Sequence, residues 1–194
     1  MNIFIAIVGM AGSGKSVVAD ELIRHGFQFF RFGQITLDII KEKGLPPSEE
    51  NEKAVREGVR KEYGMGAYAI LNMPKIDNYL KKGNVAGDGL YSWDEFKILK
   101  EKFGSQMYVL SVFAPPSLRY ERLTNRKILK EDTSLRNRPM TPEQAKARDF
   151  AEIENIAKAG PIAMADFTLV NTGSIVDLHK QLDKILNDII YNGK

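Results

Sequence analysis

Short apolar runs alternate along this chain with longer stretches in which apolar residues follow helical spacing. The runs are rich in β-branched and aromatic side chains and predict strands at residues 3–8, 28–32, 84–86, 107–113 and 167–170. Apolar residues over 178–189 recur at the spacing of one helix face. Strands that alternate with helices predict a mostly parallel sheet covered on both faces. We therefore expect a three-layer α/β fold with five strands and about eight helices.

Capping signals mark where several of these helices begin or end. Residues 92–95 and 141–144 have the capping-box spacing, and residues 174–177 match it more loosely. Gly26 stands where the helix after the first strand would end. Residues 33–82 form the longest crossover between strands, and we expect two or three helices there.

Length and composition limit the class of protein. The chain has 194 residues, the size of one domain, and 43% of them are hydrophobic. The absence of cysteine excludes disulfides, thiolate catalysis and cysteine-ligated metals. His25 and His179 lie far apart in the sequence, and we interpret both as structural. The longest apolar run, residues 3–8, is too short to span a bilayer and follows no basic segment, so we expect a cytoplasmic protein without a membrane partner.

A glycine-rich segment joins the first strand to the next helix. It reads GMAGSGKS over residues 9–16 and matches the phosphate-binding pattern G-x-x-x-x-G-K-[ST]. Its backbone N–H groups and the helix N-terminus would hold phosphates, Lys15 would reach the β- and γ-phosphates, and Ser16 would ligate Mg²⁺. A glycine-rich turn without a ligand is the alternative, and we favour a site for ATP and Mg²⁺. The residues that we expect at the nucleotide are Gly9, Gly12, Ser13, Gly14, Lys15, Ser16 and Val17.

A carboxylate follows the third predicted strand. Sites of this kind place a second acidic group near Mg²⁺ at the end of a neighbouring parallel strand. Asp88, followed by Gly89, has this position and would hold the ion through water. The alternative is an ordinary Asp-Gly turn.

The positive charge is concentrated in one segment. The formal net charge of the chain is only +3, but residues 117–148 hold nine basic and four acidic residues. Arg119, Arg122 and Arg126 have the spacing of one helix face, and Arg136 and Arg138 follow in a polar stretch. We expect Arg122, Arg126, Arg136 and Arg138 to neutralise the transferred phosphoryl group, with residues 127–141 as a lid. A solvated basic helix is the alternative.

These features together resemble the nucleoside-monophosphate-kinase branch of the P-loop fold, which includes adenylate kinase, and its dephospho-CoA-kinase-like relatives. The chain is most similar to a dephospho-CoA-kinase-like subgroup, and the resemblance covers nearly its whole length as a single domain, 1–194. It implies an acceptor-binding helical insertion at residues 33–82 and an adenine-side loop with Asn171 and Gly173. Acceptor contacts are expected from Arg31, Gly33, Gln34, Arg56, Arg60, Asp88 and Gly89.

The acceptor motif departs from these families. Gln34 and Leu37 stand where adenylate kinases carry Asp and Arg, and Leu90 and Tyr91 stand where an Arg closely follows the Asp-Gly. The carboxylate that follows the second strand in dephospho-CoA kinases is also missing from residues 31–34. The acceptor therefore stays open. An exposed salt-bridged face is an alternative for Arg56 and Arg60.

The leading hypothesis is an ATP- and Mg²⁺-dependent phosphotransferase that acts on a nucleotide-like small molecule. A phosphate acceptor needs orientation and charge neutralisation, whereas a hydroxyl also benefits from a base, so we favour a nucleoside monophosphate over the ribose hydroxyl of dephospho-CoA. The rival is a nucleotide-binding switch or ATPase that acts on a protein or RNA partner. Direct nucleic-acid binding is disfavoured because the excess charge is confined to one segment. We expect a monomer or homodimer.

Overall fold

The structure is a computed structural model, which describes residues 1–126 and 139–191. Its centre is a five-stranded sheet in the order β2-β3-β1-β4-β5, with every neighbouring pair parallel. The predicted fold class is confirmed. The strands are β1 (Phe4–Val8), β2 (Gln28–Arg31), β3 (Val85–Asp88), β4 (Met107–Phe113) and β5 (Phe167–Val170).

Nine α-helices and one short 3₁₀-helix, η1 (Gly104–Gln106), accompany these strands in the described residues. Three of the α-helices fill the long crossover, as predicted. The helices are α1 (Lys15–Arg24), α2 (Gln34–Glu42), α3 (Glu49–Tyr63), α4 (Ala67–Leu80), α5 (Trp93–Phe103), α6 (Pro116–Thr124), α7 (Pro142–Ile156), α8 (Ala159–Ala163) and α9 (Ile175–Tyr191).

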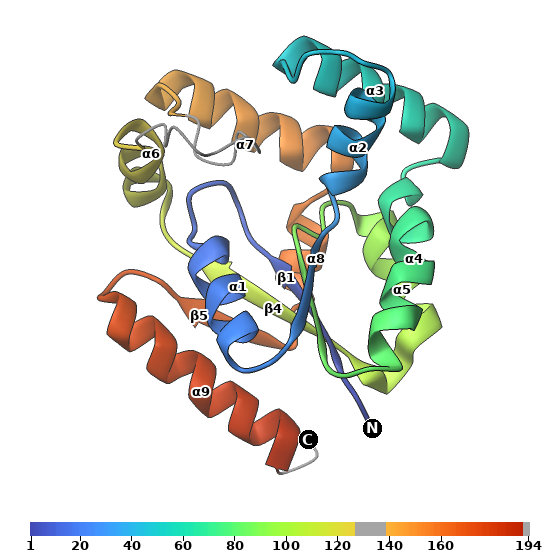
Figure 1. The fold of residues 1–194 in the computed structure, drawn as a ribbon. Helices are drawn as coiled ribbons and strands as arrows, with labels where there is room; N and C mark the ends of the chain where they lie inside the picture. Colours follow the sequence, from blue (N-terminus) through green and yellow to red (C-terminus); the bar gives the residue numbers. More distant parts are fainter. Residues whose placement is uncertain (127–138, 192–194) are drawn as a thin grey trace.

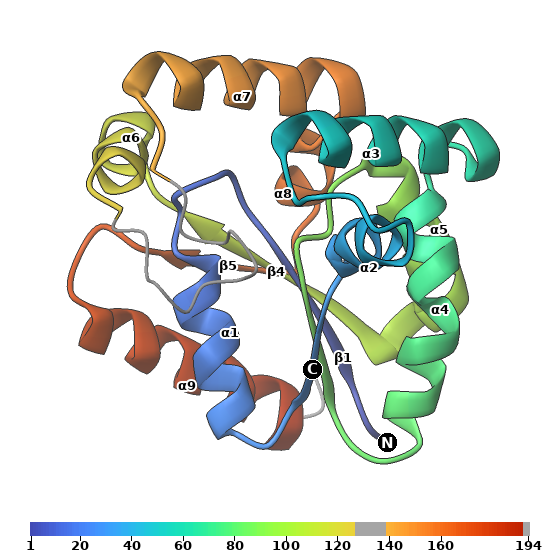
Figure 2. The ribbon, with the colours of Figure 1, turned by 45° about the horizontal axis from the view of Figure 1, so that its top comes forward.

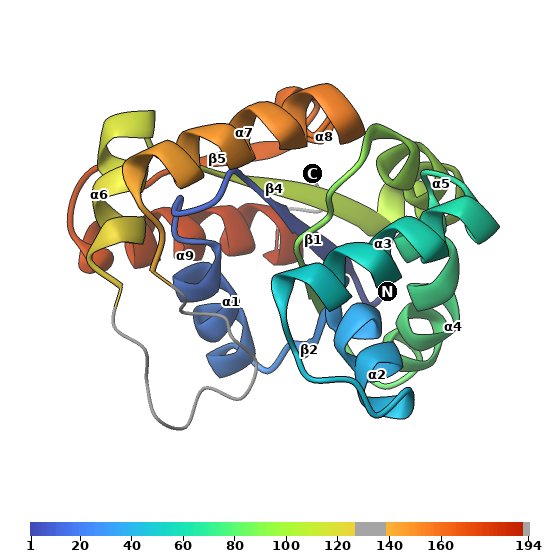
Figure 3. The same cartoon turned by 90° about the horizontal axis from the view of Figure 1, so that it is seen from above.

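The helices cover the sheet in two layers (Figure 1). On one face α1 and α9 pack their apolar residues against the sheet, with Leu22 and Leu182 fully buried between them. On the other face α4 and α5 do the same through Ile76 and Leu99. The α2–α3 pair and the α6–α7 pair stand on either side of the strand ends that lead into α1 and α2 (Figures 2 and 3). Both pairs therefore border the edge of the sheet where the glycine-rich loop lies.

Local capping chemistry fixes the helix starts that the sequence predicts. The hydroxyls of Ser92 and Thr141 each accept a hydrogen bond from the N–H of the third helical residue. The side chain of that third residue accepts one from the N–H of the capping residue, so both capping boxes are confirmed. Ser174 makes the same reciprocal contacts with Asp177 at the start of α9. No helix in the two described ranges has both the length and the apolar content that a membrane crossing requires.

Candidate active site

The glycine-rich loop leaves β1 and enters α1 in a conformation that glycine favours. Gly12 and Gly14 have φ angles of +79° and +104°. A Cβ at Gly12 would lie 2.7 Å from the carbonyl oxygen of Arg119, and one at Gly14 would clash with the side chain of Asn171. No side chain caps α1, which leaves its first backbone N–H groups open to an anion. Val17 packs against the core and helps to fix the helix beneath the loop.

Lys15 folds back over its own loop. Its Nζ donates to the carbonyl oxygens of Gly9 at 2.9 Å and Met10 at 3.1 Å. Burial, together with the positive charge of Lys158, lowers the pKa of Lys15 from 10.5 to about 7. The two hydrogen-bond acceptors are uncharged carbonyl oxygens, while the charges of Asp88 and Glu152 partly offset the lowering of this pKa.

Asp88 is the last residue of β3. The strand therefore extends beyond the predicted limit at residue 86, which was too early. It lies opposite Ile7 of β1 and Arg31 of β2 in the parallel register. Its Oδ1 is buried and has no hydrogen-bond partner among the described residues. A buried carboxylate oxygen without a hydrogen-bond partner is suited to contact a cation. Asp88 and the Ser16 hydroxyl are therefore groups that could hold Mg²⁺.

The side chains of Arg119, Arg122 and Arg126 do not share one helix face. Arg119 is buried and forms a two-pronged ion pair with Asp149 of α7, and it also donates to the carbonyl oxygens of Ala11 and Ala114. Because α6 ends at residue 124, Arg126 lies beyond the helix rather than on its face, which corrects the expected arrangement. Arg119 therefore ties α7 to the glycine-rich loop.

Arg122 contacts the loop that precedes α9. Its Nη2 donates to the carbonyl oxygen of Asn171 at 3.0 Å, while its Nη1 is buried without a hydrogen-bond partner in the part of the chain that the structure describes. Asn171 donates in turn to the carbonyl oxygen of Ser13 at 2.7 Å. Asn171, expected beside the base, thus braces the loop, and Gly173 follows it in an exposed turn. The predicted contacts of Arg136 and Arg138 lie outside the described residues.

A buried ion pair that the sequence reasoning missed lies beside Lys15. Lys158 is 2% exposed, and its Nζ lies 2.6 Å from Glu152 Oε2. Burial raises the pKa of Glu152, but Lys158 and Arg148 outweigh this effect and hold the pKa at about 2. Burial also lowers the pKa of Lys158, and the charge of Glu152 partly offsets this shift. Lys158 and Arg148 lower the pKa of Lys15 and Asp88 raises it, so α7 and the turn after it act electrostatically on the glycine-rich loop.

The backbone turn after α7 directs Lys158 inward. Ala157 has a φ of +50°, the one non-glycine residue with a positive φ in the described parts of the chain. The N–H of Lys158 donates to the carbonyl oxygen of Glu152, which adds a backbone contact to the side-chain pair. In the sequence, the pair could be recognised only from Arg148, which stands four residues before Glu152. This spacing is typical of an ion pair on the exposed face of a helix. Nothing local indicates that Lys158 is buried.

Charged residues from β2 and α7 lie near the phenol of Tyr91. Arg31 and Arg148 act electrostatically on Tyr91, and burial raises the pKa of that phenol to about 12. Cβ atoms at Gly33 and Gly89 would lie 3.5 and 3.2 Å from the Tyr91 hydroxyl, so both predicted glycines border this ring. Tyr91, one of the two residues that stand where the resembled families carry an arginine, thus lies beside Gly33 and Gly89.

The two arginines of α3 differ in their surroundings. Arg60 lies over the ring of Tyr68 at 5.5 Å, and its Nε is buried without a hydrogen-bond partner among the described residues. Arg56 lies 3.4 Å from Glu52, the helix pair that the sequence offered as an alternative. Gln34 donates to Asp38 on the exposed side of α2. Arg60 therefore lies against the buried ring of Tyr68. The contacts of Arg56 and Gln34 include local partners on their own helices.

Glu95 carries a buried carboxyl group at the start of α5. Its Oε2 accepts from the backbone N–H groups of Tyr91 and Ser92 at 2.9 and 3.2 Å. Burial raises the pKa of Glu95 from 4.5 to about 7, although these hydrogen bonds and the charge of Arg60 oppose the shift. Between these two pH values the folded protein keeps a proton that the unfolded chain releases. This carboxyl group therefore reduces stability progressively as the pH rises through that window.

We expect Glu95→Gln to stabilise the protein at pH 8, by about 2 kcal/mol relative to the native chain, and to change stability much less at pH 5. The amide keeps an acceptor oxygen for the two backbone N–H groups but carries no charge to desolvate. Denaturant unfolding at both pH values measures the difference, with Glu101→Gln on the exposed side of α5 as the control. An equal effect at both pH values would contradict a raised pKa.

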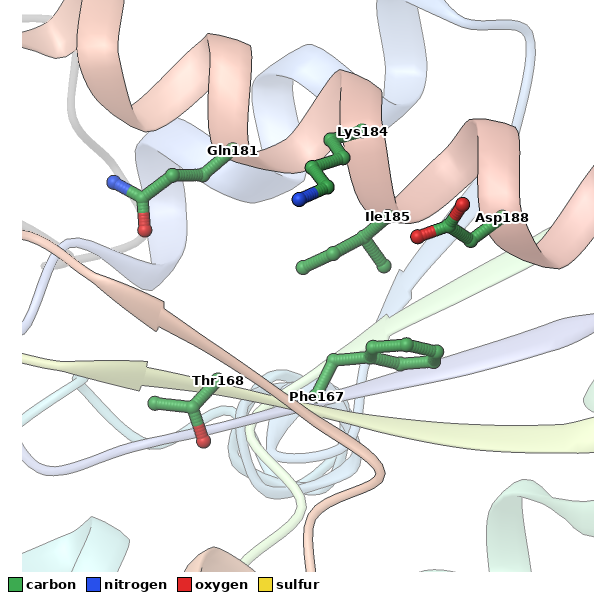
Figure 4. Close-up of a pocket in the computed structure, with 6 residues that line it drawn as sticks. All are labelled: Phe167, Thr168, Gln181, Lys184, Ile185 and Asp188. Carbon is green, nitrogen blue, oxygen red and sulfur yellow. The ribbon is translucent and has the colours of Figure 1, made fainter. Parts of the chain in front are cut away.

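A groove lies between the edge strand β5 and helix α9. Figure 4 shows Lys184 and Asp188 of α9 on one side and Phe167 and Thr168 of β5 on the other. Gln181 accepts from the N–H of Val170 and donates to its carbonyl oxygen, so it occupies hydrogen-bonding positions on the edge strand. This groove contains none of the predicted site residues.

Known proteins similar to the chain are found by sequence and by structure. Residues 5–150 match the family model AAA_18, described as an AAA domain. A UPF0200 protein of Pyrococcus abyssi is 34% identical over 189 residues, which are 96% of this chain and 97% of that protein. One of Thermococcus kodakarensis is 32% identical over 188 residues, with shares of 96% and 97%. A UPF0200/UPF0201 protein of Archaeoglobus fulgidus is 32% identical over 97% of this chain but only 56% of that longer protein.

Solved structures with lower identity share the fold. TT1252 from Thermus thermophilus has a TM-score of 0.60 at 21% identity and covers 97% of this chain and 98% of its own. A shikimate kinase from Bacteroides thetaiotaomicron has a TM-score of 0.58 at 10% identity, with shares of 96% and 98%. A gluconokinase from Sinorhizobium meliloti has a TM-score of 0.55 at 12% identity, with shares of 99% and 98%.

The sheet order and the loop between β1 and α1 match a P-loop, kinase-like α/β fold. The chain belongs to the UPF0200 family and to the AAA domain family AAA_18. The predicted resemblance to P-loop kinases is thus confirmed at the level of the fold. The dephospho-CoA-kinase-like subgroup stays a prediction.

Proposed function

We propose that the protein is an ATP- and Mg²⁺-dependent phosphotransferase that moves the γ-phosphoryl group of ATP to a nucleotide-like small molecule. The observation that carries this proposal is a set of three buried charged atoms without hydrogen-bond partners among the described residues: Asp88 Oδ1, Arg60 Nε and Arg122 Nη1. Unpaired buried charges are costly to a folded protein, so a site that keeps them is suited to an ionic ligand.

The donor side of the reaction uses the loop and α1. Lys15 turns from the carbonyl oxygens of Gly9 and Met10 to the β- and γ-phosphates, and the open N–H groups of α1 hold the remaining phosphate oxygens. Ser16 and Asp88 would hold Mg²⁺, which would neutralise charge on the phosphate oxygens. Arg122 stabilises the transferred group through its unpaired Nη1.

The acceptor side uses the cations around Tyr91 and Glu95. Arg31, Arg60 and Arg148 favour an acceptor that is itself anionic, and such an acceptor needs no base. We therefore propose a nucleoside monophosphate as the acceptor. Asp88 could instead take a proton from a hydroxyl, so transfer to the ribose hydroxyl of dephospho-CoA is the alternative within this class.

An acceptor panel tests the function. The protein is incubated with ATP, Mg²⁺ and each nucleoside monophosphate or dephospho-CoA in turn, and ADP is measured with and without the acceptor. We expect one acceptor to raise ADP formation by at least about 10-fold, because solvent is a poor substitute for a bound acceptor. ADP release at the same rate with every acceptor and with none would contradict the proposal.

A nucleotide-dependent switch that acts on a protein partner is the second candidate. Two observations favour it: the acceptor motif departs from that of known kinases at Gln34 and Tyr91, and the Archaeoglobus fulgidus relative joins two families in one longer chain. A second family fused to this one could supply a partner of the nucleotide site. ATP hydrolysis that is stimulated by such a protein, and by no small molecule, would support this candidate.

A further inference from the structure

The two histidines of the chain meet where α1 packs against α9. His25 follows the last residue of α1, and its Nε2 lies 3.0 Å from Asp183 Oδ1 and 3.7 Å from Glu21 Oε1. His179 approaches the same glutamate from α9, with its Nε2 3.5 Å from Glu21 Oε2. Residues that the sequence separates widely thus form one cluster of two imidazoles and two carboxylates.

The spacing on both elements suits a metal ion. Glu21 and His25 are four residues apart, and so are His179 and Asp183, so each element presents one carboxylate and one imidazole on the same side. Ligand atoms of Glu21, His25 and Asp183 lie within 4.8 Å of one another. His179 Nε2 is buried and has no hydrogen-bond partner in the described part of the chain, although it is aimed at this cluster.

We propose that Glu21, His25, His179 and Asp183 form a binding site for a divalent transition metal of the zinc class. Imidazole nitrogens with carboxylate oxygens are a ligand set for Zn²⁺, whereas Mg²⁺ and Ca²⁺ prefer oxygen ligands alone. The two carboxylates balance the charge of the ion, and the C-terminal end of α1 adds a favourable partial negative charge.

One cation already contacts this cluster. Arg24 Nη1 lies 2.7 Å from Glu21 Oε2, but the Arg24 side chain is 63% exposed. A solvent-exposed ion pair contributes little free energy, so Arg24 can turn into solvent when a metal ion takes its place. The ion would then join the end of α1 to α9, at the opposite end of the helix from Lys15. The site is therefore independent of the proposed kinase activity.

Thermal unfolding with zinc tests this proposal on untagged protein without nucleotide. We expect Zn²⁺ at about 100 times its Kd to raise the Tm by about 5 °C, EDTA to reverse the rise, and Mg²⁺ to have no such effect. The His25→Gln/His179→Gln double variant should lose the rise. Glu154→Gln, which changes an exposed carboxylate of α7, is the matched control and should keep it.

Cobalt provides a readout that does not depend on stability. Co²⁺ bound by this mixed nitrogen and oxygen set should give visible absorption bands that are lost in the double variant and displaced by Zn²⁺. Two results would overturn the proposal: no change in Tm and no cobalt spectrum in the native chain, or equal responses in the native chain and the double variant.

Discussion

Replacing Lys15 with alanine is expected to reduce phosphoryl transfer by about 10³-fold, because the loop then loses the cation that stabilises charge on the β- and γ-phosphates. The fold should persist. Within the described residues, Lys15 donates its side-chain hydrogen bonds to carbonyl oxygens of its own loop, and its lowered pKa means that its charged form is less stable in the folded chain than in water. The measurement is acceptor-dependent ADP formation, with Tm recorded on the same sample.

The matched control for this variant is Lys97→Ala. Lys97 lies on α5 in an exposed ion pair with Asp94, far from the loop in the sequence and not part of the charge cluster around Lys15. It should keep full activity. A Lys15→Ala protein with native Tm and native turnover would contradict the role assigned to this lysine.

Replacing Arg119 with methionine is expected to lower the free energy of unfolding by about 3–5 kcal/mol, because Asp149 is then left as a buried unpaired charge. The Arg119 and Asp149 side chains are only 5% and 7% exposed, so water cannot compensate. The carbonyl oxygens of Ala11 and Ala114 also lose their donors. The Tm should fall by about 10 °C in a chain of this size.

Two further variants distinguish the effect of losing the buried ion pair from the effect of changing the side-chain size. Arg119→Met combined with Asp149→Leu should recover part of the lost stability, because no unpaired charge remains. Arg24→Met, which breaks an exposed pair, should change stability by less than about 0.5 kcal/mol. A small effect of Arg119→Met alone would contradict the buried ion pair.

The fold could be predicted from the sequence because its signals are local. The apolar runs at β1 and β4 and the capping boxes at Ser92 and Thr141 each depend on a few neighbouring residues. The loop over residues 9–16 was recognisable for the same reason, since glycine spacing within eight residues sets the backbone path. The end of β3 was predicted too early, because the short apolar run ended before Gly87 and Asp88.

The surroundings of the site could not be predicted, because they depend on distant packing. Arg119 has helix spacing that suits an exposed basic face, yet its partner Asp149 comes from a helix thirty residues later. Lys158 has no motif around it, and its burial follows from the turn at Ala157 and the position of Glu152. His25 and His179 were interpreted as structural because they lie far apart in the sequence. The sequence could not show that α9 packs against α1, which brings both side chains into one cluster.

The transfer itself can be measured directly with γ-labelled ATP. The labelled nucleotide is incubated with Mg²⁺, the protein and the acceptor panel, and the label is followed by chromatography and mass spectrometry. The proposed function predicts label in one nucleotide-like product, with a nucleoside diphosphate formed from its monophosphate, and none with Lys15→Ala. Label that appears only as inorganic phosphate, whatever acceptor is present, would contradict a small-molecule kinase.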